Sequence, residues 1–293
     1  MASLYQRFGG GLATIFIALV FLWLAGMVLA PNVMMIDYAL RPNLPPAQIG
    51  GPNDVYSLDN VLYLANEAVH RSIFFKTIWA SAFVAFITFV VCYPLAFWLA
   101  QRATPGQTAI AILALTIPFW INEVLRTLAW YIILAFRGPL NAVLLNMGII
   151  EAPVRWYGNI GVLAGMVYAY ILFMLFPIYN SIESLDKSQI EAARDLGAST
   201  WRIHWRVVMP HAKAGIATGC VFTFMLAAGS YVAPALLGAP GSRWFTEVIY
   251  NWFFEGGDWN RGAAYALVLL VLCLVVVLAT LKIARVSLTD VAK

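Results

Sequence analysis

Long apolar blocks alternate with shorter polar segments along the chain. A hydrocarbon core about 30 Å thick takes roughly 20 helical residues to cross. Six blocks reach that length: about 11 to 30, 73 to 100, 108 to 135, 160 to 180, 214 to 237 and 263 to 281. Lipid offers no partner to backbone N–H and C=O groups, and the blocks do not alternate with period two. Each block is therefore predicted to be a helix rather than a barrel strand.

The first block also allows a second interpretation, because Arg7 precedes it and small residues end it, as in a cleaved signal peptide. Its apolar run is longer than the usual core of about 7–15 residues in such a peptide. We therefore expect a retained helix that ends at Pro31.

Composition supports the same fold class. Of 293 residues, 62% are hydrophobic and 11% charged, whereas a soluble domain has roughly 45–50% apolar and about 25% charged residues. The sequence thus predicts an all-α polytopic membrane protein, with residues 1–293 forming one domain of six transmembrane helices.

The loop charges indicate the orientation. With the N-terminus inside, the inner segments hold ten of the 18 basic residues and five of the 14 acidic ones. The excess of Lys and Arg on that side predicts that both termini are cytoplasmic. Such a chain belongs in the inner membrane of a bacterium as a multi-pass protein.

The outer segments are expected to be mostly irregular. Residues 31 to 70 are rich in Pro, Gly and Asn, with a short helix near 59 to 70, and residues 136 to 159 include a short helix from about 140 to 150. No internal repeat is visible, so the inverted halves of many secondary transporters are not recognisable.

Metal chemistry finds no support in the sequence. Cys92, Cys220 and Cys273 each lie inside an apolar block, where buried small hydrophobes are the expected reading. The three histidines are scattered, without the spacing of a shared metal. We predict no metal site and no nucleic-acid partner.

The longest inner loop, residues 181 to 213, reads as two short helices separated by a turn. Ser188 and Glu191 fit a capping box that begins the first helix, and Gly197 supplies a left-handed residue that ends it. Ser199 or Thr200 then caps a second helix, which Pro210 ends before the fifth span.

This loop is either a solvated connector or a docking surface. A connector needs neither a capped helix nor two adjacent alanines that let another backbone approach closely. The loop also carries apolar residues expected to need cover from outside: Ile190, Leu196, Ile203, Val207 and Val208. We favour the docking surface.

One pattern in the loop resembles the EAA motif of ABC importer permeases. It comprises Glu191-Ala192-Ala193, Arg194, Asp195, Gly197, Ile203 and Pro210, placed between the fourth and fifth of six spans. The resemblance implies that this segment, with Ser188, docks into an ATPase subunit and transmits its movement to the spans.

Further runs resemble the first permease subunit of spermidine/putrescine importers: Pro118-Phe119-Trp120 with Arg126, residues 181–186, residues 191–198 and residues 229–238. The resemblance implies a second permease, two ATP-binding subunits that hold ATP and Mg, and a periplasmic solute-binding protein. The chain has no Gly-x-x-x-x-Gly-Lys-Ser/Thr loop, so it carries no ATP cofactor itself and is not an enzyme.

Two charges fall inside the third span, where a charge is costly and is a functional candidate by default. Glu123 and Arg126 are spaced for an ion pair on one helical face. Alternatively, Glu123 lies on the translocation path of a cationic solute, beside the rings of Trp120 and Trp130. An anionic solute would use Arg126 instead. Tyr231 completes the candidate path.

A different class of protein also fits Glu123, namely an ion-coupled secondary transporter in which this carboxylate is the proton or cation site. That reading leaves the capped alanine helix of residues 188–197 without a role. A membrane enzyme is disfavoured because no His, Cys, Ser or acidic side chains pair at catalytic spacing.

Overall fold

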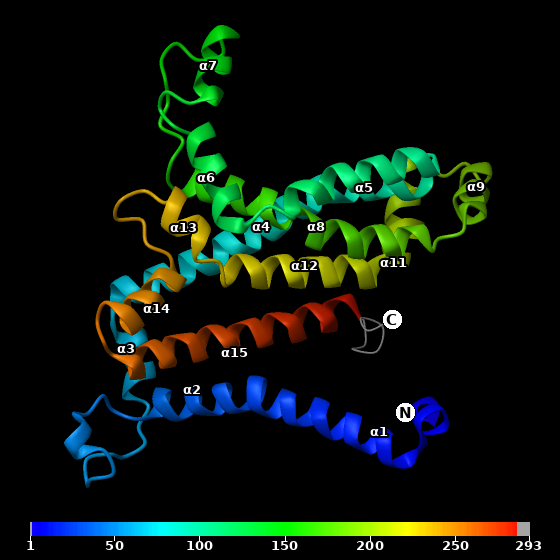
Figure 1. Cartoon of the computed structure of the whole chain (residues 1–293). Helices are drawn as coiled ribbons and strands as arrows, with labels where there is room; N and C mark the ends of the chain where they lie inside the picture. The colour runs from blue at the N-terminus through cyan, green and yellow to red at the C-terminus, as the bar shows by residue number, and fades with distance from the viewer. Residues whose placement is uncertain (1, 286–293) are drawn as a thin grey trace. The chain divides into compact units, whose positions relative to one another are not determined.

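All regular structure in the described part of the chain is helical (Figure 1). The computed structural model describes the backbone of residues 2–285 and the side chains from residue 11 onward. Asp290 and Lys293, which entered the loop charges, lie outside the described residues. The helices are α1 Ala2–Leu24, η1 Ala25–Leu29, α2 Ala30–Leu40, η2 Pro46–Gln48, α3 Asp59–Asn66, α4 Ala68–Gln101, α5 Pro105–Phe119, α6 Glu123–Ile133, α7 Pro139–Asn146, α8 Asn159–Glu183, α9 Lys187–Asp195, α10 Thr200–Ile203, η3 His204–Val208, α11 Met209–His211, α12 Lys213–Ala228, α13 Val232–Leu237, α14 Phe245–Phe254 and α15 Trp259–Ala284.

Four helical stretches among the described residues are long and apolar enough to cross a membrane: Gly11–Leu40, α4, α8 and α15. Two bent pairs bring the number to six when each pair is one span. They are α5 with α6, bent by 93°, and Thr200–His211 with α12, bent by 76°. The six predicted apolar blocks are confirmed, but the third and fifth are not continuous helices.

The described chain divides into two compact units. One comprises Met1–Ala68 with Ile249–Leu270, and the other comprises Val69–Val248 with Val271–Lys293. Each unit is treated by itself below.

In the first unit, the opening helix does not stop at Pro31, contrary to the sequence prediction. It passes through the π-helical turn η1 and continues as α2 to Leu40. Proline lacks an N–H and its ring collides with the carbonyl one turn earlier. A π-turn immediately before Pro31 widens the helix at that carbonyl, so the chain remains helical.

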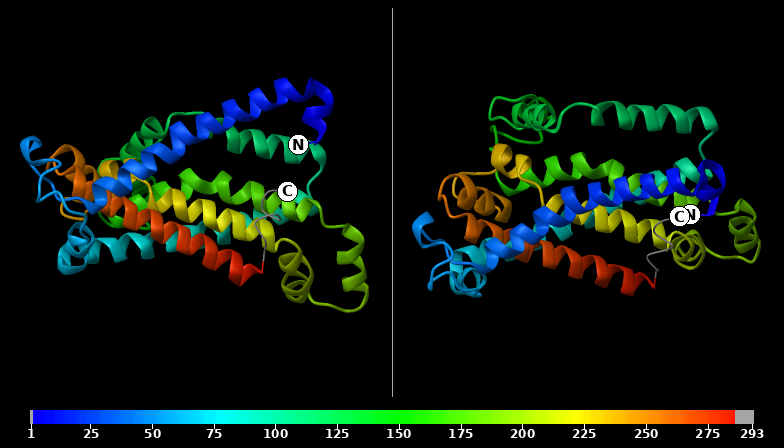
Figure 2. Two further views of the ribbon diagram at one scale, coloured as in Figure 1. Left: turned by 90° about the horizontal axis from the view of Figure 1, so that it is seen from below. Right: turned by 60° about the horizontal axis from the view of Figure 1, so that its bottom comes forward.

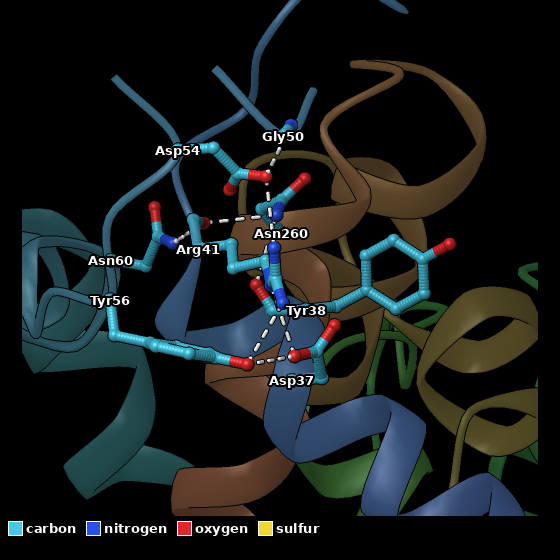
Figure 3. A network of polar contacts seen from close by, with 8 residues as sticks. All are labelled: Asp37, Tyr38, Arg41, Gly50, Asp54, Tyr56, Asn60 and Asn260. Carbon is cyan, nitrogen blue, oxygen red and sulfur yellow. Dashed lines mark hydrogen bonds and ion pairs between the residues drawn. The ribbon is translucent and has the colours of Figure 1, made fainter. Parts of the chain in front are cut away.

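The end of α2 is held by a network of charged and polar side chains (Figure 3). The Arg41 guanidinium donates to Asp37 at 3.0 Å, to Asp54 at 2.9 Å and to the Tyr56 hydroxyl at 2.8 Å. The Tyr56 hydroxyl in turn donates to Asp37. These contacts fold the irregular segment 41–58 back onto the helix end.

Two asparagine amides complete this helix terminus. Asn60 donates to the carbonyls of Ala39 and Arg41, and Asn260, at the start of α15, donates to those of Tyr38 and Arg41 (Figure 3). The last carbonyls of a helix have no intrahelical donor. Side chains from two distant segments supply the donors here.

The second unit is built on the close packing of α8 against α12, which run side by side in every view (Figures 1 and 2). Gly215 and Gly219 of α12 face α8 without a side chain. A Cβ at Gly215 would collide with the Pro177 carbonyl and the Ser181 hydroxyl. Glycine at this contact therefore permits a backbone approach that a larger residue prevents.

A buried asparagine organises the outer segment of this unit. Asn141, at the start of α7, donates to the carbonyls of Ala135, Phe136 and Val154. Its Oδ1 atom accepts from the Val154 N–H and the Trp156 indole. One side chain thus ties the end of α6 to the segment that leads into α8.

We predict that Gly215→Ala destabilises the protein by about 1–3 kcal/mol, because the added methyl overpacks the α8–α12 contact. The matched control is Gly106→Ala on α5, where a Cβ meets nothing within 4 Å and where alanine favours the helix. The measurement is thermal unfolding of both variants in detergent. A Gly215→Ala midpoint equal to that of Gly106→Ala would contradict the close approach.

Candidate functional site

The first candidate site is α9, in the loop 181–213. Its start differs from the predicted capping box of Ser188 and Glu191. The helix begins at Lys187, and the Asp186 carboxylate accepts from the Ser188 N–H at 3.0 Å. Aspartate caps a helix as well as serine does and adds a favourable charge at the positive end of the helix dipole. The Ser188 N–H holds the pKa of Asp186 below its usual value.

The end of α9 agrees with the prediction. Gly197 has a φ of +77°, and its N–H donates to the Arg194 carbonyl at 2.9 Å. The Ala198 N–H donates to the Ala193 carbonyl at 3.0 Å. These two bonds form a Schellman motif, which favours glycine at the left-handed position.

One side of α9 is anchored and the other is free. Ile190 is buried in the same core cluster as Ile182 and Leu185, which precede the helix. The exposed residues include Ser188, Glu191, Ala192, Arg194, Asp195 and Leu196, and Leu196 is 89% exposed. Figure 2 shows α9 at the far end of α8, clear of the long helices of this unit.

The expectation that five apolar loop residues need outside cover is wrong for three of them. Ile190, Ile203 and Val208 are buried within the chain itself, in one core cluster with the inner ends of α4 and α8. The exposed apolar surface lies instead on Leu196, Trp201 and Trp205. A docking partner would therefore meet a smaller and more aromatic patch than predicted.

The second half of the loop is more helical than expected. Ser199 caps it by accepting from the Arg202 N–H, and α10, η3 and α11 form a continuous stretch to His211. Pro210 does not end this stretch directly. The π-turn η3 precedes the proline, as at Pro31, and the 76° bend follows at Ala212.

The second candidate site is the break between α5 and α6. Pro118 lies in the last turn of α5, and the Asn122 side chain caps α6 by accepting from the Val124 N–H at 2.9 Å. The chain therefore turns by 93° over three residues. Trp120 stands on this bend with 85% of its surface exposed, and Glu123 is the exposed first residue of α6.

Glu123 and Arg126 both lie in the described part of the chain, and no ion pair joins them. The Arg126 guanidinium lies instead over the rings of Phe119, at 5.5 Å, and Tyr168, at 6.0 Å. It lines a cavity of about 180 Å³ between α5 and α8. The ion-pair interpretation of Glu123 is thus not what the structure shows.

The remaining path candidates come from neighbouring elements. Trp130 of α6 contacts the Tyr168 ring edge-to-face at 5.6 Å. Tyr231 lies at the second break, between α12 and α13, and α13 packs against both α6 and α8. The structure thus brings the two breaks of this unit onto adjacent helices.

Metal and thiol chemistry were also considered. Within residues 2–285, no group of three or more His, Cys, Asp or Glu side chains is placed to hold a metal ion. The three cysteines are free thiols, and Cys92 donates to the Ile171 carbonyl from α4 to α8.

Comparison with known families decides the class of the chain. A family profile described as "Binding-protein-dependent transport system inner membrane component" matches residues 2–285. The chain belongs to this family. It is a permease subunit of an ABC importer and a multi-pass inner-membrane protein.

Relatives in this family include the spermidine/putrescine transport system permease protein PotB of two bacteria. The protein of Haemophilus influenzae is 30% identical over 261 residues, 87% of this chain and 88% of the relative. That of Escherichia coli K12 is 33% identical over 254 residues, 84% of this chain and 88% of the relative. The resemblance to the first polyamine permease is confirmed at the level of homology.

Solved structures of the family share the fold. A chain of a bacterial ABC transporter involved in alginate import has a TM-score of 0.76 at 16% identity, covering 94% of this chain and 95% of that one. A chain of the MetNI methionine ABC transporter in an inward-facing form has a TM-score of 0.52 at 18% identity, covering 72% and 91%.

We predict that Asp186→Ala speeds amide hydrogen exchange several-fold across residues 187–195, because the first turn of α9 loses its cap. Asp186→Asn retains a capping oxygen and is expected to exchange like the wild type. Since the pKa of Asp186 is lowered in the folded protein, the carboxylate's contribution is full above the usual aspartate pKa. It is lost as the pH falls through the lowered value. Equal exchange in all three proteins would contradict the assigned cap.

Proposed function

We propose that this permease forms, with a second permease subunit, the translocation path for a small amine-bearing solute such as a polyamine. A periplasmic binding protein delivers the solute, and two ATP-binding subunits supply the energy from the cytoplasmic side. Both termini are then cytoplasmic, on the side of α9. The observation that carries the proposal is α9 itself, a short helix capped at both ends, anchored by Ile190 and exposed elsewhere.

The geometry of α9 suits a coupling helix that sits in a cleft of an ATPase subunit. Ala192 offers a small exposed surface for close approach, and Glu191 offers a charged contact beside it. The same helix is linked to the spans, because Gln101 at the end of α4 donates to the carbonyls of Ile182 and Leu185 just before α9. A push on α9 would therefore move α4 and α8 together.

For the cargo, the break between α5 and α6 provides the recognising groups. Glu123 is exposed and has no ion-pair partner among the described residues. The exposed ring of Trp120 lies three residues before it. A carboxylate beside an aromatic ring suits an ammonium group through charge and cation–π attraction. Relationship to the PotB proteins supports the same solute class.

We predict that Gly197→Asp leaves the protein in the membrane but uncouples solute uptake from ATP hydrolysis in the assembled transporter. A β-carbon at φ +77° strains the end of α9 and the added charge alters its exposed face. Asparagine tolerates the left-handed conformation, so Gly197→Asn serves as the uncharged control and should retain most coupling. Uptake by Gly197→Asp at the wild-type rate would refute the docking role.

We predict that Glu123→Gln lowers putrescine uptake roughly tenfold, the effect of losing one charged contact. The matched control is Glu151→Gln, which removes an exposed carboxylate from the outer segment after α7 and should leave uptake unchanged. Both variants are assayed in proteoliposomes that contain the complete transporter. Uptake that proceeds without the ATPase subunits and follows a proton gradient would instead establish a secondary transporter.

A further inference from the structure

An open apolar groove of about 750 Å³ lies in the second unit, between the second half of α4 and the segment from Thr200 to Met209. Along α4, its wall consists of residues one helical turn apart: Phe86, Phe89, Val90, Tyr93, Phe97, Trp98 and finally Arg102. From Phe86 to Arg102 the chain rises about 24 Å. The groove therefore follows the axis of a membrane-crossing helix for much of one leaflet.

The polar groups in the groove wall largely satisfy each other. The Tyr93 hydroxyl is hydrogen-bonded to Nδ1 of His204 at 2.8 Å. The His204 ring also packs edge-to-face on Phe97, with ring centroids 4.4 Å apart. The groove thus presents apolar surface along its length, with the guanidinium of Arg102 at its end.

A second, smaller hollow adjoins that end. It measures about 160 Å³ and shares Phe97 and Arg102 with the groove. Its charged residues are Arg102, Lys187, Arg194 and Glu191. Among the described residues, none of the three cations forms an ion pair. Three cations against one carboxylate make this a site for an anion.

The hollow also contains an unused acceptor. Gln101 donates through Nε2 to two carbonyls at 2.8 and 3.2 Å, which fixes the orientation of its amide. Its Oε1 atom is buried and has no hydrogen-bond partner. A buried acceptor without a donor is costly, and a ligand in the hollow with a hydroxyl or ammonium group would supply the donor.

We propose that the groove and the hollow together bind one anionic phospholipid of the cytoplasmic leaflet, such as phosphatidylglycerol. An acyl chain occupies the groove along α4, and the phosphate lies at Arg102, Lys187 and Arg194. A headgroup hydroxyl donates to Oε1 of Gln101.

A long apolar groove that ends in cations matches an amphiphile better than a protein helix, which would bring no charge to that end. The indoles of Trp98, Trp201 and Trp205 around the mouth are the side chains expected at headgroup level. Anionic lipids are concentrated in this leaflet, and each nearby Lys or Arg strengthens their binding. The bound headgroup would bridge the end of α4 to α9.

The inference is tested by native mass spectrometry of the assembled transporter with phosphatidylglycerol and phosphatidylcholine of the same acyl chains. We expect selective retention of phosphatidylglycerol. Arg102→Gln should weaken it roughly fivefold, and Val90→Trp should abolish it by filling the groove. Arg206→Gln, an exposed arginine of the same segment outside both hollows, should bind normally.

Two further arms identify the parts of the ligand. Phosphatidylmethanol keeps the phosphate but lacks a donor, so it should bind roughly fivefold more weakly if Gln101 accepts a hydrogen bond. Inorganic phosphate at millimolar concentration should not displace the lipid if the acyl chain matters. Equal retention of both headgroups, or normal binding by Arg102→Gln, would overturn the proposal. So would a cross-link from a cysteine at Val90 to the second permease, since a protein would then fill the groove.

Discussion

The structure depends on one constraint: in lipid, a backbone group that leaves its helix must find another partner within the protein. Every interruption of an apolar span therefore brings its own solution. Pro31 and Pro210 are each preceded by a π-turn, and Asn122 caps α6 where α5 has ended. At the end of α2, the amides of Asn60 and Asn260 serve the last carbonyls. The breaks are built features of the helices.

The same constraint concentrates chemistry at the breaks. A helix that starts inside a span presents N–H groups and the positive end of its dipole. Glu123, as the first residue of α6, is stabilised there without a basic partner. Arg126, one turn further on, is accommodated by the rings of Phe119 and Tyr168 instead. An acid thus remains available to solvent or solute, although a cation lies nearby in the sequence.

Sequence reasoning recovered what depends on local pattern and length. The apolar blocks, the left-handed Gly197 and the motif of α9 are all short-range features. The breaks were missed because an average over an apolar block does not register one capping asparagine such as Asn122. Asp186 was overlooked because Ser188 offered an equally good cap two residues later. Contacts such as Arg41 with Asp54 join segments whose approach only the fold determines.

The coupling loop shows how local and distant contacts combine into a lever. The caps of α9 make it a stiff unit, but stiffness alone transmits nothing to the spans. Transmission requires fixed attachments, which are Ile190 in the core cluster and the Gln101 amide between α4 and the residues that precede α9. Because the close contact at Gly215 joins α8 to α12, a displacement of α9 would reach three helices at once. A rigid docking helix and close-packed spans are therefore parts of one mechanical requirement.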